Sequence, residues 1–221
     1  MASREGRVVL DLSSVSHPCS VYYQILGPWP ATTRPVLTLH GGPGFTHDYL
    51  LSLEDLTRPP FNLTLIFFDQ LGSGKSTHLP EKFLNHDFWN EALFLVQIVA
   101  LLDHLDIKND YDCIGHSWGG MLASSHAAQQ PFGLKRLVLA HTPISGELWL
   151  KAYRGYRELM PASQRQILEQ HRNAESSLEP AYLEAIQAFN RRHFLNLEVV
   201  PAEVMRSYDA IGQDRTVTLS T

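Results

Sequence analysis

The hydrophobic residues of this chain follow two different spacings. Short runs rich in β-branched and aromatic residues predict strands, and these runs cover residues 7–12, 19–26, 35–39, 63–68, 111–114 and 134–140. Apolar residues at helical spacing predict helices between them, at 47–56, 88–105 and 121–128. Because strands and helices alternate from residue 36 to residue 141, the pattern predicts a parallel α/β sheet.

Three details extend this prediction. The first two runs are separated by a turn-rich spacer, which indicates an antiparallel hairpin at the entry to the sheet. Asp87 is the expected N-cap of the second helix, at 88–105, whose face toward the sheet would consist of Trp89, Leu93, Val96, Val99 and Leu102. The apolar runs at 63–68 and 134–140 are expected to be buried strands.

The chain changes character after residue 143. It is helical, charged and aromatic in pattern from there on, and no strand signal returns until the last few residues. Pro180 after Glu179 marks the start of one helix. We therefore expect three parts, namely an α/β core over 1–143, an inserted helical lid over 144–214, and a strand that starts the return to the core over 215–221.

Composition narrows the function classes. The 221 residues carry 18 basic and 23 acidic side chains, a net charge of -5. No basic cluster is present, so we expect no nucleic-acid or membrane partner. Only Cys19 and Cys113 are present and no signal-like apolar segment opens the chain, which favours a cytoplasmic location. Without a His-Glu-x-x-His or paired Cys-x-x-Cys motif, no metal or other cofactor is expected.

The strongest chemical signal is a G-x-S-x-G pattern at Gly115-His-Ser-Trp-Gly119, between a strand-like run and a helix-like run. In such a turn the central serine takes up a strained backbone conformation that leaves its hydroxyl exposed. Small flanking residues keep the neighbouring elements from colliding. Ser117 is therefore the predicted nucleophile, against the alternative of a glycine-rich turn with an incidental serine.

A second glycine-rich segment, His40-Gly-Gly-Pro-Gly44, ends an earlier strand. Glycines allow backbone amides to approach a reacting carbonyl closely, as an oxyanion hole requires. The alternative is an ordinary tight turn. His40 itself is interpreted as a structural hydrogen-bonding residue, because it lies before the serine.

The segment from Asp69 to Ser76 resembles the end of a phosphate-binding loop. The full pattern G-x-x-x-x-G-K-[ST] fails at its first glycine, because Asp69 stands there. A carboxylate would repel phosphate, so we interpret this loop as structural support beneath the active site.

Three motifs thus stand in a fixed order, His40-Gly-Gly-Pro-Gly44, Asp69-Gln-x-Gly-x-Gly-x-Ser76 and Gly115-His-Ser-Trp-Gly-Gly120. Together they resemble the proline iminopeptidase family of α/β hydrolases, and the resemblance continues into the helical segment at 180–185 and 189–194. It implies an α/β-hydrolase fold with a helical lid. The family removes N-terminal residues, often proline, from peptides, and some members hydrolyse amino acid amides, so a small peptide or amide is the implied substrate.

The resemblance also implies roles for single residues. Ser117 would attack the carbonyl, and the backbone amides of Gly42 and Trp118 would hold the oxyanion. Glu184 falls where the family's lid binds the free amino group of the substrate, although a single helix glutamate is also a common solvated charge. A second family glutamate has no match, and Asp214 is a candidate replacement.

A base for the serine is harder to assign. In this fold the partners follow the nucleophile in the order Asp or Glu, then His, but the histidines after Ser117 are His126, His141, His171 and His193. None of them follows a suitable acid beyond the lid. The family places both partners after two further strands, so the resemblance implies that the last strands of the fold and the triad acid and base are absent from this chain.

Several hypotheses follow. The favoured one is a truncated serine hydrolase of the proline iminopeptidase type, whose activity as this chain is in doubt. A fragment of an active enzyme and an enzyme that uses a lid histidine such as His193 are alternatives. A non-catalytic hydrolase-like binding protein and an esterase of the same fold complete the set.

Overall fold

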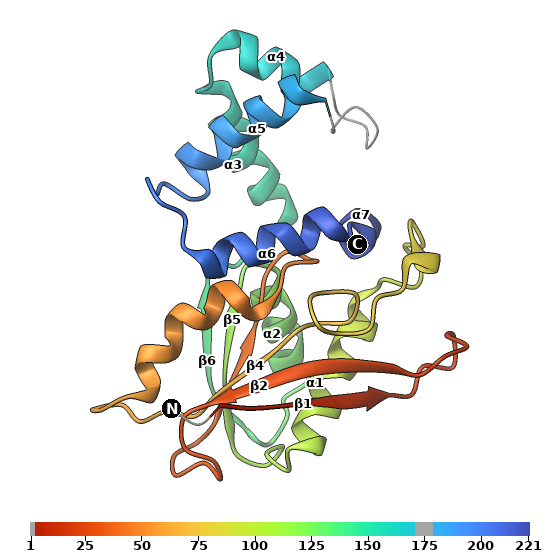
Figure 1. The fold of residues 1–221 in the computed structure, drawn as a ribbon, viewed down its shortest axis with the longest axis vertical. Helices are drawn as coiled ribbons and strands as arrows, with labels where there is room; N and C mark the ends of the chain where they lie inside the picture. Colours follow the sequence, from red (N-terminus) through yellow and green to blue (C-terminus); the bar gives the residue numbers. More distant parts are fainter. Residues whose placement is uncertain (1–2, 171–178) are drawn as a thin grey trace. The chain divides into compact units, whose positions relative to one another are not determined.

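A computed structural model describes residues 3–170 and 179–221 of the chain. It contains two compact units (Figure 1). The first unit joins residues 1–142 to residues 201–221, and the second unit comprises residues 143–200. The first carries a sheet flanked by helices and the second is helical, so the division into an α/β part and a helical part follows the predicted pattern.

The first unit is built on a six-stranded sheet with the order β1-β2-β4-β3-β5-β6. Its strands are β1 (Ser3–Leu10), β2 (Cys19–Leu26), β3 (Val36–Leu39), β4 (Leu65–Phe68), β5 (Tyr111–His116) and β6 (Leu134–Ala140). β1 and β2 form the predicted antiparallel hairpin, and β2 is also antiparallel to β4. The remaining pairs, β4 with β3, β3 with β5 and β5 with β6, are parallel, which confirms the α/β prediction.

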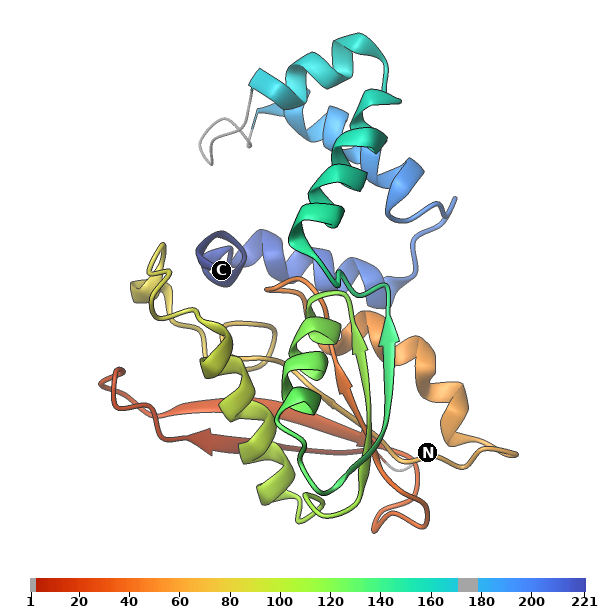
Figure 2. The same ribbon diagram turned by 180° about the vertical axis from the view of Figure 1, so that it is seen from behind.

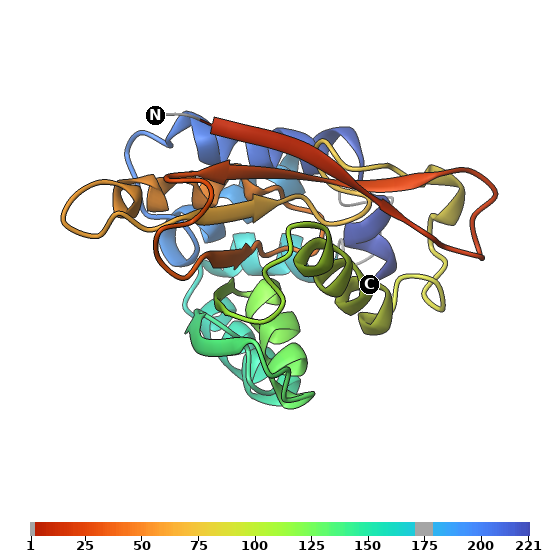
Figure 3. The same cartoon turned by 90° about the horizontal axis from the view of Figure 1, so that it is seen from below.

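Helical segments cover both faces of the central strands. Successive side chains of a strand point to opposite faces, and in β4 Ile66 and Phe68 join one buried cluster whereas Leu65 and Phe67 join another. The first cluster includes residues of α1 (Glu91–His104) and α2 (Trp118–Ala128), which lie together on one side of the sheet (Figures 2 and 3). The second packs against the 3-10 helix η1 (His47–Thr57), so β3 and β4 are covered on both sides.

The predicted start and face of α1 are wrong in detail. Its N-cap is Asn90, whose side chain accepts a hydrogen bond from the backbone N–H of Leu93, and not Asp87. Asp87 lies too early because the chain first makes a turn after the short 3-10 helix η2 (Pro80–Lys82), in which the Trp89 indole donates to the carbonyl of Lys82.

The buried face of α1 is also rotated from the predicted one. Its buried members are Phe94, Gln97, Ile98, Leu101 and Leu102. Val96 and Val99, which were expected to face the sheet, are about half exposed, at 52% and 45%. When apolar residues cover most of a helix, their spacing alone does not show which face is buried. Gln97 is buried because its side-chain oxygen accepts the backbone N–H of Leu71, in the loop after β4.

β6 does not fulfil the expectation of a buried strand. Among the described strands it forms one edge of the sheet and pairs with β5 alone. Val138 is 52% exposed and Leu139 is 43% exposed. Apolar composition predicted burial, but burial depends on the neighbours that a strand has in space, and β6 has a neighbouring strand on one side only.

The C-terminal residues correct the predicted boundaries. α6 (Ala202–Gln213) groups with the first unit and packs against η1, although the sequence placed it in the helical lid. The predicted final strand is also wrong, because Thr216–Ser220 forms the short helix α7. Val217 of α7 is buried in the main core. Residues 201–221 thus belong to the sheet-bearing unit and add two helices, α6 and α7, to it.

The second unit consists of α3 (Gly146–Glu158), α4 (Ala162–Gln170) and α5 (Pro180–His193). The side chain of Ser145 caps α3 by accepting from the amide of Leu148. α5 begins as predicted, with Glu179 at the N-cap and Pro180 in the first turn. The small core of this unit consists of Met160, Leu168, Ala185 and Phe189. Across the described ranges of both units, no helix has the length and apolar character required to cross a membrane.

Candidate active site

The predicted nucleophile lies at a strained turn. Ser117 connects the end of β5 to the start of α2 and has φ 52° and ψ -119°. A residue with a side chain rarely adopts this conformation, which costs on the order of 1–3 kcal/mol and is concentrated at functional sites. The backbone N–H of Ser117 donates to the carbonyl of Ala140 at 2.9 Å, which ties the turn to β6.

The glycines around the turn are required by close packing. A Cβ atom on Gly119 would lie 2.6 Å from the carbonyl oxygen of His40, and one on Gly115 would lie 2.6 Å from Cα of Gly120. Real Cβ atoms do not approach other atoms so closely. The sequence pattern therefore has the steric cause that was expected of it, since β5, α2 and the end of β3 meet at this point.

The glycine-rich loop after β3 lies directly beside the serine. A Cβ atom on Gly41 would be 3.1 Å from Cβ of Ser117. The next residue, Gly42, has φ 120°, a conformation that favours glycine. Trp118 is the first residue of α2, and the first amides of a helix have no partner within the helix. This arrangement suits a group that holds an oxyanion, and the roles of Gly42 and Trp118 remain predictions.

Gln70 connects the two loops. Its side-chain N–H₂ donates to the carbonyl of His40 at 2.9 Å, while its side-chain oxygen accepts from the indole N–H of Trp118 at 3.0 Å. The side chain is buried. Sequence reasoning did not single out this residue, although it is the second residue of the motif that begins at Asp69.

His40 is held as a neutral structural residue. Its Nε2 accepts the backbone N–H of Gln70 at 3.0 Å, and its Nδ1 lies 2.9 Å from the carbonyl of Gly41. An acceptor role for Nε2 leaves the ring proton on Nδ1, which then donates to that carbonyl. Burial lowers the pKa of His40 to about 4. Both nitrogens are engaged, so the ring is not a base for Ser117.

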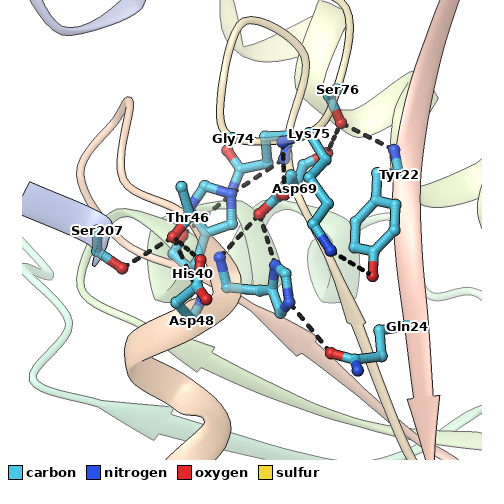
Figure 4. A network of polar contacts seen from close by, with 12 residues as sticks. Tyr22, Gln24, His40, Thr46, Asp48, Asp69, Gly74, Lys75, Ser76 and Ser207 are labelled. Atoms are coloured by element: carbon cyan, nitrogen blue, oxygen red, sulfur yellow. Dashed lines mark hydrogen bonds and ion pairs between the residues drawn. The ribbon is translucent and has the colours of Figure 1, made fainter. Parts of the chain in front are cut away.

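Asp69 fills the interior of the loop that resembled a phosphate-binding site (Figure 4). One carboxylate oxygen accepts the backbone N–H of Lys75 at 2.9 Å, and the other accepts the backbone N–H and ring Nδ1 of His47 at 2.9 and 2.7 Å. Burial raises the pKa of Asp69, but the hydrogen bonds from His47 outweigh that effect and hold the pKa below its usual value. A carboxylate thus takes the amides that a phosphate would need, which argues against nucleotide binding.

Further contacts of this network anchor the loop to the sheet. Ser76 donates to the carbonyl of Asp69 at 2.5 Å and accepts the backbone N–H of Tyr22 at 2.8 Å. Nζ of Lys75 lies 3.2 Å from the hydroxyl of Tyr22 (Figure 4). The loop is therefore fixed to β2, which agrees with the interpretation that it supports the site.

The described histidines that follow Ser117 do not form a triad with it. His126 is buried in α2, where its Nε2 meets the hydroxyl of Tyr111 at 2.5 Å. His193 lies in the second unit, with its ring stacked on Tyr156. His171 lies outside the described residues. None of these described rings is hydrogen-bonded to Ser117.

Two histidines lie at the ends of the strands beside the turn. His116 precedes Ser117, and its ring centroid is 5.6 Å from that of His141, which follows β6. His141 has φ 49°, an uncommon conformation for a residue with a side chain. Nδ1 of His116 is engaged by the hydroxyl of Tyr49 at 2.8 Å, and the same hydroxyl accepts the backbone N–H of Gly41 at 2.6 Å.

Asp214, the proposed replacement for a second substrate-binding glutamate, is engaged elsewhere. Its carboxylate lies 2.5 Å from Nδ1 of His78 and accepts the backbone N–H of Thr216 at 2.8 Å. The other nitrogen of His78 lies 2.9 Å from the carbonyl of Gly74. Asp214 and His78 therefore connect the end of α6 to the loop that Asp69 organises, and this long-range pair gave no signal in the sequence.

Glu184, the other predicted substrate-binding residue, is an exposed residue of α5 in the second unit. Its role toward a substrate remains a prediction. No group of three or more His, Cys, Asp or Glu side chains within residues 3–170 and 179–221 is arranged to hold a metal ion.

Known proteins resemble this chain over most of its length. The family model for the alpha/beta hydrolase fold matches residues 34–221. The proline iminopeptidase of Lactiplantibacillus plantarum is 34% identical over 174 residues. Among solved structures, the proline iminopeptidase of Mycobacterium smegmatis matches with 32% identity and a TM-score of 0.79, and VinJ matches with 37% identity and a TM-score of 0.87.

These relatives are longer than the chain. The match covers 78% of this chain but 58% of the L. plantarum protein. The chain likewise covers 69% of each of the two solved structures, while 96% of its own residues are matched.

Proposed function

Because the chain belongs to the alpha/beta hydrolase fold family and is proline iminopeptidase-like within it, we propose that it is a serine hydrolase acting on small peptides or amides. The proposed reaction removes an N-terminal residue, proline or another, from a peptide, or hydrolyses an amino acid amide. No cofactor takes part in this proposal.

The observation that carries the proposal is the conformation of Ser117 beside the glycine loop. The backbone of Ser117 is strained in the way that exposes a nucleophile. Gly41 lies so close that a Cβ atom on it would be 3.1 Å from Cβ of Ser117. Strain of this kind persists only when the surrounding structure enforces it. Here the enforcing contacts are the close packing at Gly115 and Gly119 and the hydrogen bond to Ala140.

In the proposed mechanism, Oγ of Ser117 attacks the carbonyl carbon of the scissile bond. The carbonyl oxygen becomes negatively charged and is held by the backbone amides of Gly42 and Trp118. One such donor is worth about 3–4 kcal/mol of transition-state stabilisation. The leaving amine takes up the proton that Ser117 has lost, and water then hydrolyses the acyl-serine, which releases the free acid and returns a proton to Oγ of Ser117. In this proposal Glu184 binds the free amino group of the substrate before the attack.

The proton of Ser117 needs an acceptor, and within residues 3–170 and 179–221 the histidines paired with a carboxylate, His17, His47 and His78, make no hydrogen bond to Ser117. The chain spans about three fifths of the curated relatives it matches. The lack of a hydrogen-bonded base for Ser117 among the described residues is the observation that favours the second candidate, a hydrolase-like protein that binds peptides or amides without turning them over. A serine without a base would retain the oxyanion hole, which alone gives roughly a thousandfold acceleration over water.

The first test compares the purified protein with its Ser117→Ala variant. We expect a fluorophosphonate probe to label the protein but not the variant, and proline or alanine arylamides to release product only with the unchanged serine. Labelling without turnover would support an activated serine with another substrate. The absence of both labelling and turnover, with arylamide binding in a calorimetric titration, would contradict catalysis and support the binding protein.

Substrate class is tested separately. An ester and the matching amide of the same amino acid distinguish a peptidase or amidase from an esterase, since fold does not fix the substrate. A Glu184→Gln variant should raise KM for substrates with a free amino group and leave KM for N-acylated esters unchanged. A cytoplasmic location remains a prediction, consistent with Cys19 and Cys113 both being free thiols.

A further inference from the structure

Tyr49 connects the two loops that the proposed reaction uses. It belongs to η1, yet its hydroxyl contacts Gly41, which precedes the proposed oxyanion residue, and His116, which precedes the proposed nucleophile. The two distances are 2.6 Å to the backbone nitrogen of Gly41 and 2.8 Å to Nδ1 of His116. One oxygen atom thus connects the glycine loop (residues 40–44) with the turn at residues 115–119 that carries Ser117, hereafter the nucleophile elbow or elbow.

The partner fixes the direction of one of these hydrogen bonds and allows that of the other to be assigned. The backbone N–H of Gly41 can only donate, so the oxygen of Tyr49 accepts it. The hydroxyl proton of Tyr49 is then free to donate to Nδ1 of His116. In this assignment Nδ1 carries no proton, and the ring proton of neutral His116 lies on Nε2.

The surroundings keep this arrangement in one protonation state. Burial raises the pKa of Tyr49, so its phenol keeps its proton at neutral pH. Burial, and secondarily the neighbouring His141, lower the pKa of His116, so its ring stays neutral at neutral pH, as a ring that accepts at Nδ1 requires. Within the described residues, the titratable side chains that face His116 are Tyr49 and His141, which follows β6.

The ring of Tyr49 is also held in place. It packs edge-on against Phe45 with a centroid distance of 5.9 Å and against His116 at 5.3 Å. Phe45 in turn packs edge-on against Tyr208 of α6 at 5.3 Å. These contacts fix the hydroxyl independently of the two hydrogen bonds, as a residue that sets the position of its neighbours requires.

We propose that Tyr49 is a positioning residue that holds the glycine loop at a fixed distance from the nucleophile elbow. This inference rests on the proposed function for its catalytic meaning, since the distance matters because the Gly42 amide and the Ser117 hydroxyl must meet at one carbonyl group. Without the hydroxyl, the Gly41 amide loses its partner and the loop is free to shift away from the elbow.

A direct test measures the loop without relying on catalysis. Tyr49→Phe keeps the ring and removes the hydroxyl, and amide hydrogen exchange read by NMR reports on Gly41. We expect the exchange rate of the Gly41 amide to rise at least about tenfold when its hydrogen bond is removed. Imidazole nitrogen shifts should show at the same time that Nδ1 of His116 has lost its hydrogen bond.

Tyr111→Phe is the matched control. Tyr111 is a buried tyrosine whose hydroxyl, like that of Tyr49, meets a histidine, in this case Nε2 of His126, but it lies at the opposite end of β5 from the elbow. This variant should leave the Gly41 exchange rate within about twofold of the unmodified protein, since the lost hydrogen bond lies elsewhere.

A second variant covers the case in which Tyr49→Phe folds poorly. His116→Ala removes the acceptor and leaves Tyr49 intact, and it should raise Gly41 exchange by a smaller factor, because the hydroxyl can still accept the amide. In the double variant the two effects should not add, as expected of residues in one hydrogen-bonded chain.

Activity gives the remaining readout and separates this inference from the proposed function. If the unmodified protein is active, Tyr49→Phe should lower kcat about tenfold or more and change KM less than twofold, since it displaces an oxyanion donor. If the unmodified protein has no reactive serine but Gly41 loses protection in Tyr49→Phe, the proposed function fails and the positioning role stands. Unchanged Gly41 exchange in a folded Tyr49→Phe variant would overturn the positioning role whatever the activity.

Discussion

The indole N–H of Trp118 donates to the side-chain oxygen of Gln70 at 3.0 Å. The side-chain N–H₂ of Gln70 donates at 2.9 Å to the carbonyl of His40. One buried side chain therefore joins the start of α2 to the end of β3. These are the two places from which the predicted oxyanion donors come. The distance between those donors is therefore set by Gln70 as well as by the backbone.

Replacement of Gln70 should be costly. Gln70→Ala leaves the buried carbonyl of His40 and the indole of Trp118 without this partner, which we expect to lower the free energy of unfolding by about 2 kcal/mol. Urea denaturation measures the loss. Gln166→Ala, at an exposed position of α4, is the control and should change stability by less than about 0.5 kcal/mol. Equal effects of the two substitutions would contradict the bridging role.

Strain at Ser117 predicts a difference between two inactive variants. Ser117→Ala keeps a Cβ atom at φ 52°, whereas Ser117→Gly removes it. The glycine variant should be the more stable of the two by about 1 kcal/mol, because glycine adopts this region without steric cost. Both proteins lack the hydroxyl, so thermal and urea unfolding compare the backbone effect alone. A more stable alanine variant would show that the turn is relaxed.

The packing at Gly119 predicts a large effect of a single methyl group. Gly119→Ala would bring Cβ to 2.6 Å from the carbonyl oxygen of His40, so the elbow must move. We expect a loss of stability of about 3 kcal/mol or a failure to fold. Gly155→Ala is the matched substitution, because a Cβ atom on Gly155 in α3 meets no atom within 4 Å. That variant should gain about 0.5–1 kcal/mol from the better helix former.

His40 predicts part of the pH dependence of stability. Burial lowers its pKa to about 4 in the folded protein, compared with an ordinary value of 6.5. Between these two pH values the unfolded chain binds more protons than the folded protein. The free energy of unfolding should therefore fall as the pH drops from 6.5 to 4, by up to about 3 kcal/mol from this residue, and level off below pH 4.

The measurement compares urea denaturation at pH 7 and pH 4.5 for the protein and a His40→Gln variant. The variant should be less stable at pH 7 and should lose less stability on acidification. His116 and His126, whose pKa values are also lowered mainly by burial, are present in both proteins and cancel in the comparison. An identical loss in both proteins would exclude His40 as the cause.

Local features of the chain were predictable because neighbouring residues decide them. The G-x-S-x-G turn and the glycine loop are encoded within a few residues each, and both have the predicted place at strand ends. The N-cap of α1 was not predictable in this way, because Asp87 and Asn90 are equally suitable residue types for an N-cap. Only the turn that buries Trp89 decides between them.

Other features depend on contacts between distant parts of the chain. Tyr49 and His116 are 67 residues apart, and His78 and Asp214 are 136 residues apart. No local pattern marks such pairs. The exposure of β6 has the same origin, because a strand is buried only when other elements cover it.

By itself, the sequence determined the alternation of strands and helices, the nucleophile turn, the glycine loop and the resemblance that connects them. These depend on backbone propensities and side-chain size over short stretches. The tertiary structure alone decided that Gln70 and Tyr49 hold the two loops together, that Asp69 fills the turn which resembled a phosphate site, and that residues 216–220 pack as a helix against the core. The physical reason is that a buried polar group must find a partner wherever the fold brings one, and that partner is rarely a neighbour in the chain.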